Sequence, residues 1–334
     1  MAETKDAGLA PMEFNHESQN GLPMVTTNTQ TPNDVPTEVD YGRSAPVDVT
    51  VEENEELPDP KNMPETAFVI AFCVKFNEAL KISFWPEDLD AALCSTEENP
   101  LIEKLNRLFL RNLLNTERLV EKNKWMTVLS NVISKRLENN EDFYLDYNPL
   151  KRVDDNYYAL SVRDKVMILQ CLVSWQLISS SKIKGLIKQQ HLGLNEDEIK
   201  PLEVEVLGED AKKSKYYYLG IGARIYRETL IPDLKNPSSM NIKWEAVSTT
   251  IHDLKKFVEN RNEIDPSRSE KENALYTKIV GQVIPYLEPL AMEKVKEEQR
   301  RQIKERKKET RRDNNLKKIL QIHNDAEILP TRTR

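Results

Sequence analysis

The stretch from Pro64 to Leu80 is apolar around most of a helical circumference, and this constrains the fold more than any other feature of the chain. Its large side chains recur every four residues, at Phe68, Phe72, Phe76 and Leu80. A helix that is apolar on nearly all sides is buried rather than laid on a surface. Other helices must therefore surround it, so the sequence predicts a mainly α protein that begins with a helical bundle.

Three segments downstream supply the helices that this bundle needs. Pro86 opens a short helix, with two carboxylates in its first turn, where they meet the positive end of the helix dipole. Residues 101–114 and 125–137 carry apolar stripes at spacings of three and four. We therefore expect residues 65–138 to form one compact bundle.

Residues 157–230 change from a helical to an alternating pattern. Ser161 begins a capping box at the start of a further apolar helix. Residues 202–207 then alternate apolar side chains with glutamates, and 216–219 supply an aromatic strand. A polar turn that begins at Gly208 would join the two. This pattern predicts a winged-helix-like segment with a short β-hairpin.

The stretch KKSKYYYLGIGARIYRE at 212–228 admits a phosphate site, a nucleic-acid site or a hairpin shared with a partner. Gly220 and Gly222 do not complete a dinucleotide-binding fingerprint, because the third glycine is replaced by Ile225. Alternate tyrosines must face the helices, so packing is favoured over stacking on bases. Arg224 and Arg227 are expected to form a surface pair rather than to contact phosphates.

Two apolar seams predict a helical extension over residues 236–292. The first passes through Trp244, Val247, Ile251, Leu254 and Val258 at alternating spacings of three and four. The second passes through Leu275, Ile279, Val283, Leu287 and Leu290, with prolines at 285 and 289 interrupting it.

Charge is distributed unevenly along the chain. Residues 1–66 hold 14 Asp or Glu against 3 Lys or Arg, whereas residues 294–334 hold 14 Lys or Arg against 7 Asp or Glu. The composition of residues 1–64 predicts a disordered acidic tail. Such a tail either keeps the chain solvated or competes for the basic surfaces of histones. Residues 293–334 predict a charged helix and basic tail.

The basic tail has three candidate uses: a nuclear-localisation signal, a clamp on linker DNA, or a solvated helix with no ligand. The residues expected to bind DNA or an import receptor are Arg300, Arg301, Lys304, Arg306, Lys307, Lys308, Arg311, Arg312, Lys317 and Lys318.

Catalytic and cofactor chemistry find little support in the sequence. The four histidines are scattered, and the three cysteines are too far apart for a paired metal site or a disulfide framework. No apolar run approaches the roughly 20 residues that span a bilayer. We therefore expect no enzyme activity, cofactor, metal, small-molecule substrate or membrane partner.

Residues 67–115 resemble the DDT domain, a small helical bundle with an aromatic first helix. Its second element, F-x-x-x-D-L-x-x-A-L, is matched by Phe84, Asp88, Leu89, Ala92 and Leu93. Residues 160–187 resemble the first WHIM motif, and 202–228 resemble the later one. The Gly-x-Asp turn and aromatic strand of the later motif fall on Gly208, Asp210, Tyr216, Tyr217 and Tyr218.

The resemblance to DDT–WHIM proteins of the remodelling-and-spacing-factor kind implies a nuclear, non-catalytic accessory subunit. Such a subunit docks an ISWI-type chromatin-remodelling ATPase and helps it engage linker DNA, with histones as a further partner. The acidic turn is implied to contact the basic DNA-binding module of the ATPase. The residues expected at this site are Gly208, Glu209, Asp210, Tyr217, Arg224 and Arg227.

A DNA-binding transcriptional regulator that acts without a remodelling ATPase is the alternative. Its folded body should be basic, because neutralising phosphates dominates such affinity. The body between the acidic leader and the basic tail carries a net charge of −3 instead. Two lysine clusters favour this alternative: Lys182, Lys184 and Lys188 on one helix, and Lys212, Lys213 and Lys215 at the wing.

Overall fold

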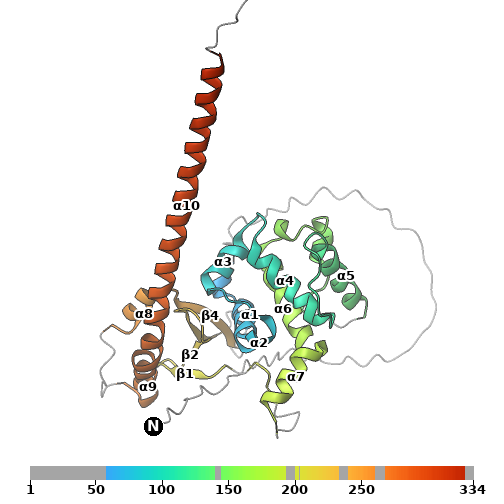
Figure 1. The fold of residues 1–334 in the computed structure, drawn as a ribbon. Coiled ribbons are helices and arrows are strands. Elements are labelled where there is room, and N and C mark those ends of the chain that lie inside the picture. Colours follow the sequence, from blue (N-terminus) through green and yellow to red (C-terminus); the bar gives the residue numbers. More distant parts are fainter. Residues whose placement is uncertain are drawn as a thin grey trace, which may run out of the picture.

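The fold is given by a computed structural model, which describes residues 58–139, 144–192, 200–202, 204–232, 240–259 and 268–327 (Figure 1). Most of residues 1–64, the predicted acidic tail, lie outside these ranges. Its last residues are structured: the short helix η1 (Pro60–Asn62) packs against α3 and β4, and Asn62 Oδ1 accepts from the amide of Ala246 at 3.0 Å.

A bundle of helices occupies the first half of the described chain. In order these are α1 (Pro64–Lys75), α2 (Asn77–Leu80), α3 (Pro86–Cys94), α4 (Pro100–Leu113), α5 (Trp125–Glu138), η2 (Pro149–Arg152), η3 (Tyr157–Ala159), α6 (Val162–Ser179) and α7 (Ser181–Gln190). Helix α6 lies against both α1 and α4. The mainly α prediction is confirmed, although the expected single helix over Pro64–Leu80 is interrupted at Phe76.

Local sequence signals set several helix starts in the bundle. The carboxylate of Asp88 accepts from the amide of Trp85 at 3.0 Å, one turn before it, and Pro86 takes the first helical position. Ser161 Oγ accepts from the amide of Asp164 at 3.1 Å and caps α6. These bonds satisfy amides that the helix itself leaves without partners.

A four-stranded antiparallel sheet follows, in the order β1-β2-β3-β4. Its strands are β1 (Val206–Glu209), β2 (Lys215–Tyr218), β3 (Ile225–Pro232) and β4 (Met240–Ser248). The predicted hairpin is present as β1 and β2, although β1 begins at Val206 rather than at residue 202, and two further strands that were not predicted extend it. The prediction of a helical extension over 236–292 is wrong in its first part. Trp244 and Val247 lie on β4, and the first apolar seam is helical only over Ile251–Phe257.

The sheet separates two apolar cores. One face adds three aromatic rings to the core of the bundle: Tyr217, Tyr226 and Trp244. The ring centroid of Trp244 lies 5.4 Å from that of Tyr217 and 5.2 Å from that of Tyr226. On the other face Tyr216 and Tyr218 join a smaller core. That core is completed by α8 (Ile251–Phe257), α9 (Glu270–Lys278), the π-helical turn η5 (Ile279–Val283) and the start of α10 (Ile284–Glu327).

Helix α10 begins inside the second core and then leaves the body of the molecule (Figure 1). Leu287 is buried, whereas every side chain from Gln299 to Lys318 is exposed. No single helix in the described ranges is long and apolar enough to cross a membrane; α6 and α7 pass that test only as a pair bent by 69°. Ten side chains of α6 are buried in the bundle.

Candidate partner-binding site

The turn between β1 and β2, residues 210–214, is called the wing turn below, and its geometry is set by Asp210. Oδ1 of Asp210 accepts from the amides of Lys212 at 2.8 Å and Ser214 at 2.9 Å. Oδ2 accepts from the hydroxyl of Tyr216 at 3.0 Å. Lys213 takes a positive φ of 62° to close the turn. Both carboxylate oxygens of Asp210, a residue that we expected to contact a partner protein, thus accept hydrogen bonds from its own turn and from Tyr216.

Gly208 and Glu209 belong to strand β1 rather than to the turn. A Cβ on Gly208 would stand 2.6 Å from Cβ of Leu275 and 3.0 Å from its Cα, so the glycine lets β1 approach the backbone of α9 closely. The carboxylate of Glu209 lies 2.8 Å from Nζ of Lys271, also on α9. This hydrogen bond holds the pKa of Glu209 below its ordinary value.

Arg224 is buried, and the prediction of a surface pair is wrong for this residue. Only 1% of its side chain is exposed, and its guanidinium makes a two-point contact with the carboxylate of Asp90 on α3, one bond of which measures 3.2 Å. A second carboxylate, Glu87, lies 3.9 Å away. Arg224 therefore joins the sheet to the bundle. Nearby, Gly222 at φ 65° leaves no room for a Cβ beside Pro86.

Arg227 points to the opposite face of the sheet and pairs there with Glu245 on β4. It is about one-third exposed, at 35%. Tyr217, whose ring is buried in the first core, donates its hydroxyl to Glu228 at 2.9 Å. Burial, followed by the charge of Glu228, raises the pKa of Tyr217. The structure therefore does not bring the six predicted site residues together: Asp210 lies in the wing turn with Glu209 beside it, whereas Arg224 and Arg227 lie on opposite faces of the sheet.

The predicted DNA or import residues lie on the exposed outer part of α10, away from the wing turn (Figure 1). All ten of their side chains are exposed. Arg301 and Lys308 pair with carboxylates of their own helix, Glu298 at 2.9 Å and Glu305 at 3.7 Å.

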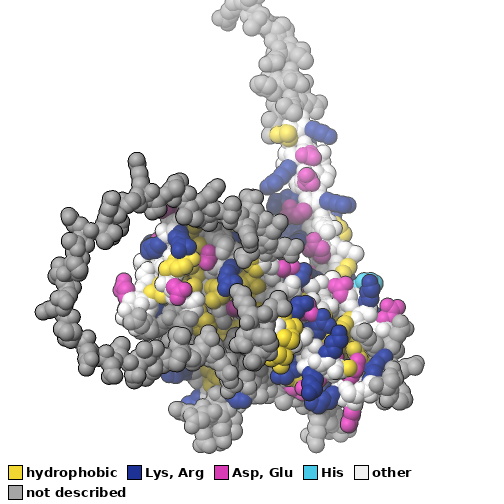
Figure 2. Space-filling model, turned by 180° about the vertical axis from the view of Figure 1, so that it is seen from behind, with side chains coloured by type: hydrophobic (Ala, Val, Ile, Leu, Met, Phe, Trp, Pro, Cys, Tyr) yellow, Lys and Arg dark blue, Asp and Glu magenta, His cyan; other side chains and the backbone are white. Residues whose placement is uncertain are grey.

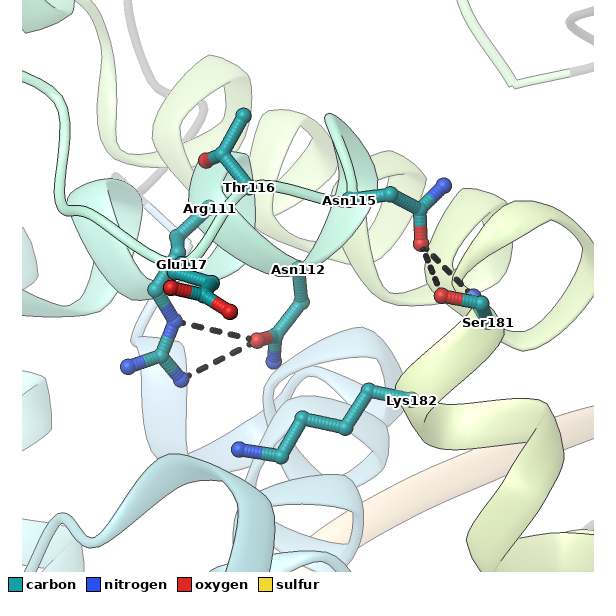
Figure 3. A pocket seen from close by; sticks show the side chains of 7 residues that line it. All are labelled: Arg111, Asn112, Asn115, Thr116, Glu117, Ser181 and Lys182. Atoms are coloured by element: carbon teal, nitrogen blue, oxygen red, sulfur yellow. Dashed lines mark hydrogen bonds between the residues drawn. The ribbon is translucent and has the colours of Figure 1, made fainter.

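A polar pocket of about 360 Å³ lies between α4 and α7 (Figure 3); it is lined by Lys182 of the first lysine cluster but by none of the residues predicted to bind the ATPase. Arg111 and Lys182 both donate to the carbonyl oxygen of Ala79, at 2.9 Å and 3.2 Å. Asn115 Oδ1 accepts from the amide and hydroxyl of Ser181 at 2.7 Å and so occupies the start of α7. The pocket is thus a polar joint between α2, α4 and α7.

Lys165 is a buried contact that sequence reasoning missed. Its side chain on α6 is 1% exposed, and Nζ donates to the carbonyl oxygens of Leu93 at 3.2 Å and Ser95 at 2.7 Å. These carbonyls end α3, where a cation meets the negative end of the helix dipole. Burial lowers the pKa of Lys165. An alternating or helical pattern gives no signal for such a residue, because lysine normally marks an exposed position.

Within the described ranges no group of three or more His, Cys, Asp or Glu side chains could hold a metal ion. Cys73 and Cys171 are buried, whereas Cys94 is exposed at the end of α3.

Comparison with family models finds WHIM1, a motif described from proteins that include WSTF, Itc1p and MBD9, at residues 145–188. The motif is found in chromatin-associated proteins. It spans η2, η3, α6 and most of α7, so the WHIM resemblance over 160–187 is confirmed and begins 15 residues earlier than expected. Neither the curated proteins nor the solved structures contain a match to this chain.

Proposed function

We propose that this chain is a non-catalytic accessory subunit of a chromatin-remodelling complex, which docks an ISWI-type ATPase and helps it engage nucleosomal linker DNA. The observation that carries the proposal is the WHIM1 match over residues 145–188. The motif occurs in chromatin-associated proteins, and its helix α6 is the one that α1 and α4 of the bundle both contact. The same match supports our proposal of a nuclear location.

The arrangement of the layers favours a docking role for the wing turn. The sheet is fixed to the bundle by Arg224 and Asp90, and β1 is fixed to α9 by the close approach of Gly208. The wing turn is therefore held in one position before any partner arrives. A preorganised surface loses little conformational entropy on binding, which improves affinity.

Glu209 is the residue of the acidic turn best suited to a basic partner. Its carboxylate is partly exposed and pairs with Lys271, whereas the carboxylate of Asp210 already accepts three hydrogen bonds. A basic module of the ATPase would compete with Lys271 for Glu209. Asp210 would contribute through the shape of the turn and through its charge.

Purification of the tagged full-length chain from nuclear extract at low salt, followed by mass spectrometry, tests the proposal. We expect an ISWI-type ATPase in the purified material. Two variants then probe the turn. Exchanging the charges in Glu209→Lys/Lys271→Glu keeps the intramolecular pair and reverses the charge offered to the partner. Asp210→Asn removes the charge but keeps an oxygen that accepts from the amides of Lys212 and Ser214.

We expect the charge exchange to lose the ATPase and Asp210→Asn to weaken its recovery, with unfolding transitions close to that of the unaltered chain. Asp155→Asn, which removes a carboxylate paired with Lys151 on the bundle, is the control and should recover the ATPase normally. Absence of the ATPase with the unaltered chain would refute the docking role. If no ATPase is recovered but the chain binds duplex DNA tightly, the alternative function, a DNA-binding transcriptional regulator, would be favoured.

A further inference from the structure

The outer part of α10 carries its charges on separate sides. Residues 294–318 hold 12 Lys or Arg against 5 Asp or Glu. An α-helix has about 3.6 residues per turn, so residues three, four and seven apart share one side. Six basic residues follow these spacings, and we call them the basic strip: Lys296, Arg300, Lys304, Lys307, Arg311 and Lys318.

The carboxylates gather on the opposite side of the helix. Glu298, Glu305, Glu309 and Asp313 follow one another at spacings of seven, four and four. Figure 2, which views the molecule from behind, shows Asp and Glu side chains in a row along α10 with Lys and Arg at its edges. Glu297 falls beside the basic strip, near its first residue.

This separation is not what stabilises an isolated helix in water. Such helices place opposite charges three or four residues apart, so that every side carries both signs. In the described part of the chain, the ion pairs within α10 are Glu298–Arg301 and Glu305–Lys308, and both lie off the basic strip. All six side chains of the strip are exposed, and no ion pair is recorded for any of them among the described residues.

The base of α10 is fixed to the body, so the strip faces a defined direction. Leu287 is buried in the second core. Lys294 lies 3.3 Å from Glu87 of α3 and 4.3 Å above the ring of Trp85, the residue that precedes this helix. Glu288 pairs with Lys255 of α8 at 2.6 Å. From Lys296 to Lys318 the strip extends about 33 Å at a rise of about 1.5 Å per residue.

We propose that the basic strip of α10 binds the phosphate backbone of a nucleic-acid duplex without reading its sequence. Duplex DNA carries one negative charge per roughly 1.7 Å of its axis, and one turn spans about 34 Å, close to the length of the strip. A row of cations of this length, laid along the duplex, crosses both phosphate strands within one turn of the DNA. The proposal deepens the DNA-binding part of the proposed function and does not depend on docking of the ATPase.

Two variants with equal charge change test whether the strip, rather than the net charge, binds DNA. Lys304→Glu/Arg311→Glu alters two members of the strip. Arg306→Glu/Lys317→Glu is the matched control, because it also replaces one lysine and one arginine but on another side of α10. The affinity of each purified full-length chain for a fluorescent duplex of about 30 base pairs is measured between about 50 and 200 mM salt.

We expect the strip variant to bind at least about tenfold more weakly than the unaltered chain, with a salt dependence reduced by about two phosphate contacts. The control should stay within about threefold, and circular dichroism should show equal helix content in all three chains. Equal weakening by both variants, or no duplex binding by the unaltered chain at low salt, would overturn the proposal. Loss of nuclear import with duplex affinity retained would instead assign the strip to an import receptor. Recovery of the ATPase is a separate measurement, so failure here leaves the docking proposal standing.

Discussion

The two faces of the sheet are attached to their neighbours by different means. The face towards the bundle buries aromatic rings and closes around a buried ion pair, Arg224–Asp90. The face towards α8–α10 also buries tyrosines, but its ion pair Arg227–Glu245 is partly exposed, as is the pair Glu209–Lys271 at the β1 edge of the sheet. Burial decides how much each ion pair contributes, because water screens the two partly exposed pairs more strongly than it screens Arg224–Asp90.

The largest effect is expected from Arg224→Ala. Removing the guanidinium leaves the carboxylate of Asp90, which is only 18% exposed, without its cation, and a fully buried charge left unpaired in this way costs about 3–5 kcal/mol of unfolding free energy, which is the upper limit here. Urea unfolding followed by circular dichroism measures this loss. Replacing both partners, as in Arg224→Met/Asp90→Leu, should cost much less, because no charge is stranded. A single variant no less stable than the double would show that the pair does not hold the sheet to the bundle.

Next in size is Gly208→Ala. The added Cβ would stand 2.6 Å from Cβ of Leu275 and close to its backbone, so β1 and α9 must separate, and overpacking of this kind costs about 1–3 kcal/mol. Gly185→Ala is the matched control, because nothing lies within 4 Å of the added atom and alanine favours the interior of α7. Urea unfolding should therefore show a loss for Gly208→Ala and no loss, or a small gain, for Gly185→Ala. An equal change in unfolding free energy for the two variants would mean that α9 is not closely packed on β1.

Local patterns predicted the bundle because its helices bury apolar stripes that the sequence displays directly. The same patterns misled at β4. Trp244, Val247 and Ile251 have the spacing of a helix, but Met240, Ile242, Trp244 and Ala246 alternate with polar residues, as a strand requires. Trp244 belongs to both patterns. The register with β3 and the rings of Tyr217 and Tyr226 decide in favour of the strand, and neither is visible locally.

The candidate site was predicted less completely than the fold, since its contacts join distant parts of the chain. Arg224 and Asp90 are 134 residues apart, so an arginine beside a glycine pair looks like a surface residue until α3 is placed against the sheet. The wing turn was placed within two residues of its position. The role of Asp210 in closing that turn needed the positions of Lys212, Ser214 and Tyr216.

Arg227→Gln should have a smaller effect than either earlier change. The guanidinium is about one-third exposed, and such ion pairs contribute about 0.2–1 kcal/mol. We expect the loss in unfolding free energy to shrink further when the salt concentration is raised, because exposed pairs are screened. Arg224→Ala should keep most of its effect in the same salt series. A loss for Arg227→Gln as large as that for Arg224→Ala would remove the difference between the two faces.

The smallest effect is expected at the Glu209–Lys271 pair. The hydrogen bond from Lys271 lowers the pKa of Glu209 from its ordinary value of 4.5. A lowered carboxylate pKa contributes stability above pH 4.5, and this contribution disappears as the pH falls through the pKa of the folded protein. Lys271→Met should therefore raise the pKa of Glu209, as followed by NMR of the side-chain carboxyl, with little change in the thermal unfolding midpoint. Lys278→Met, which removes the cation paired with Glu205 on the same helix, is the control and should leave the pKa of Glu209 as it is in the unaltered chain. If the pKa of Glu209 is the same in Lys271→Met as in the unaltered chain, the ion pair does not form in solution. The carboxylate of Glu209 would then be free to bind a basic partner.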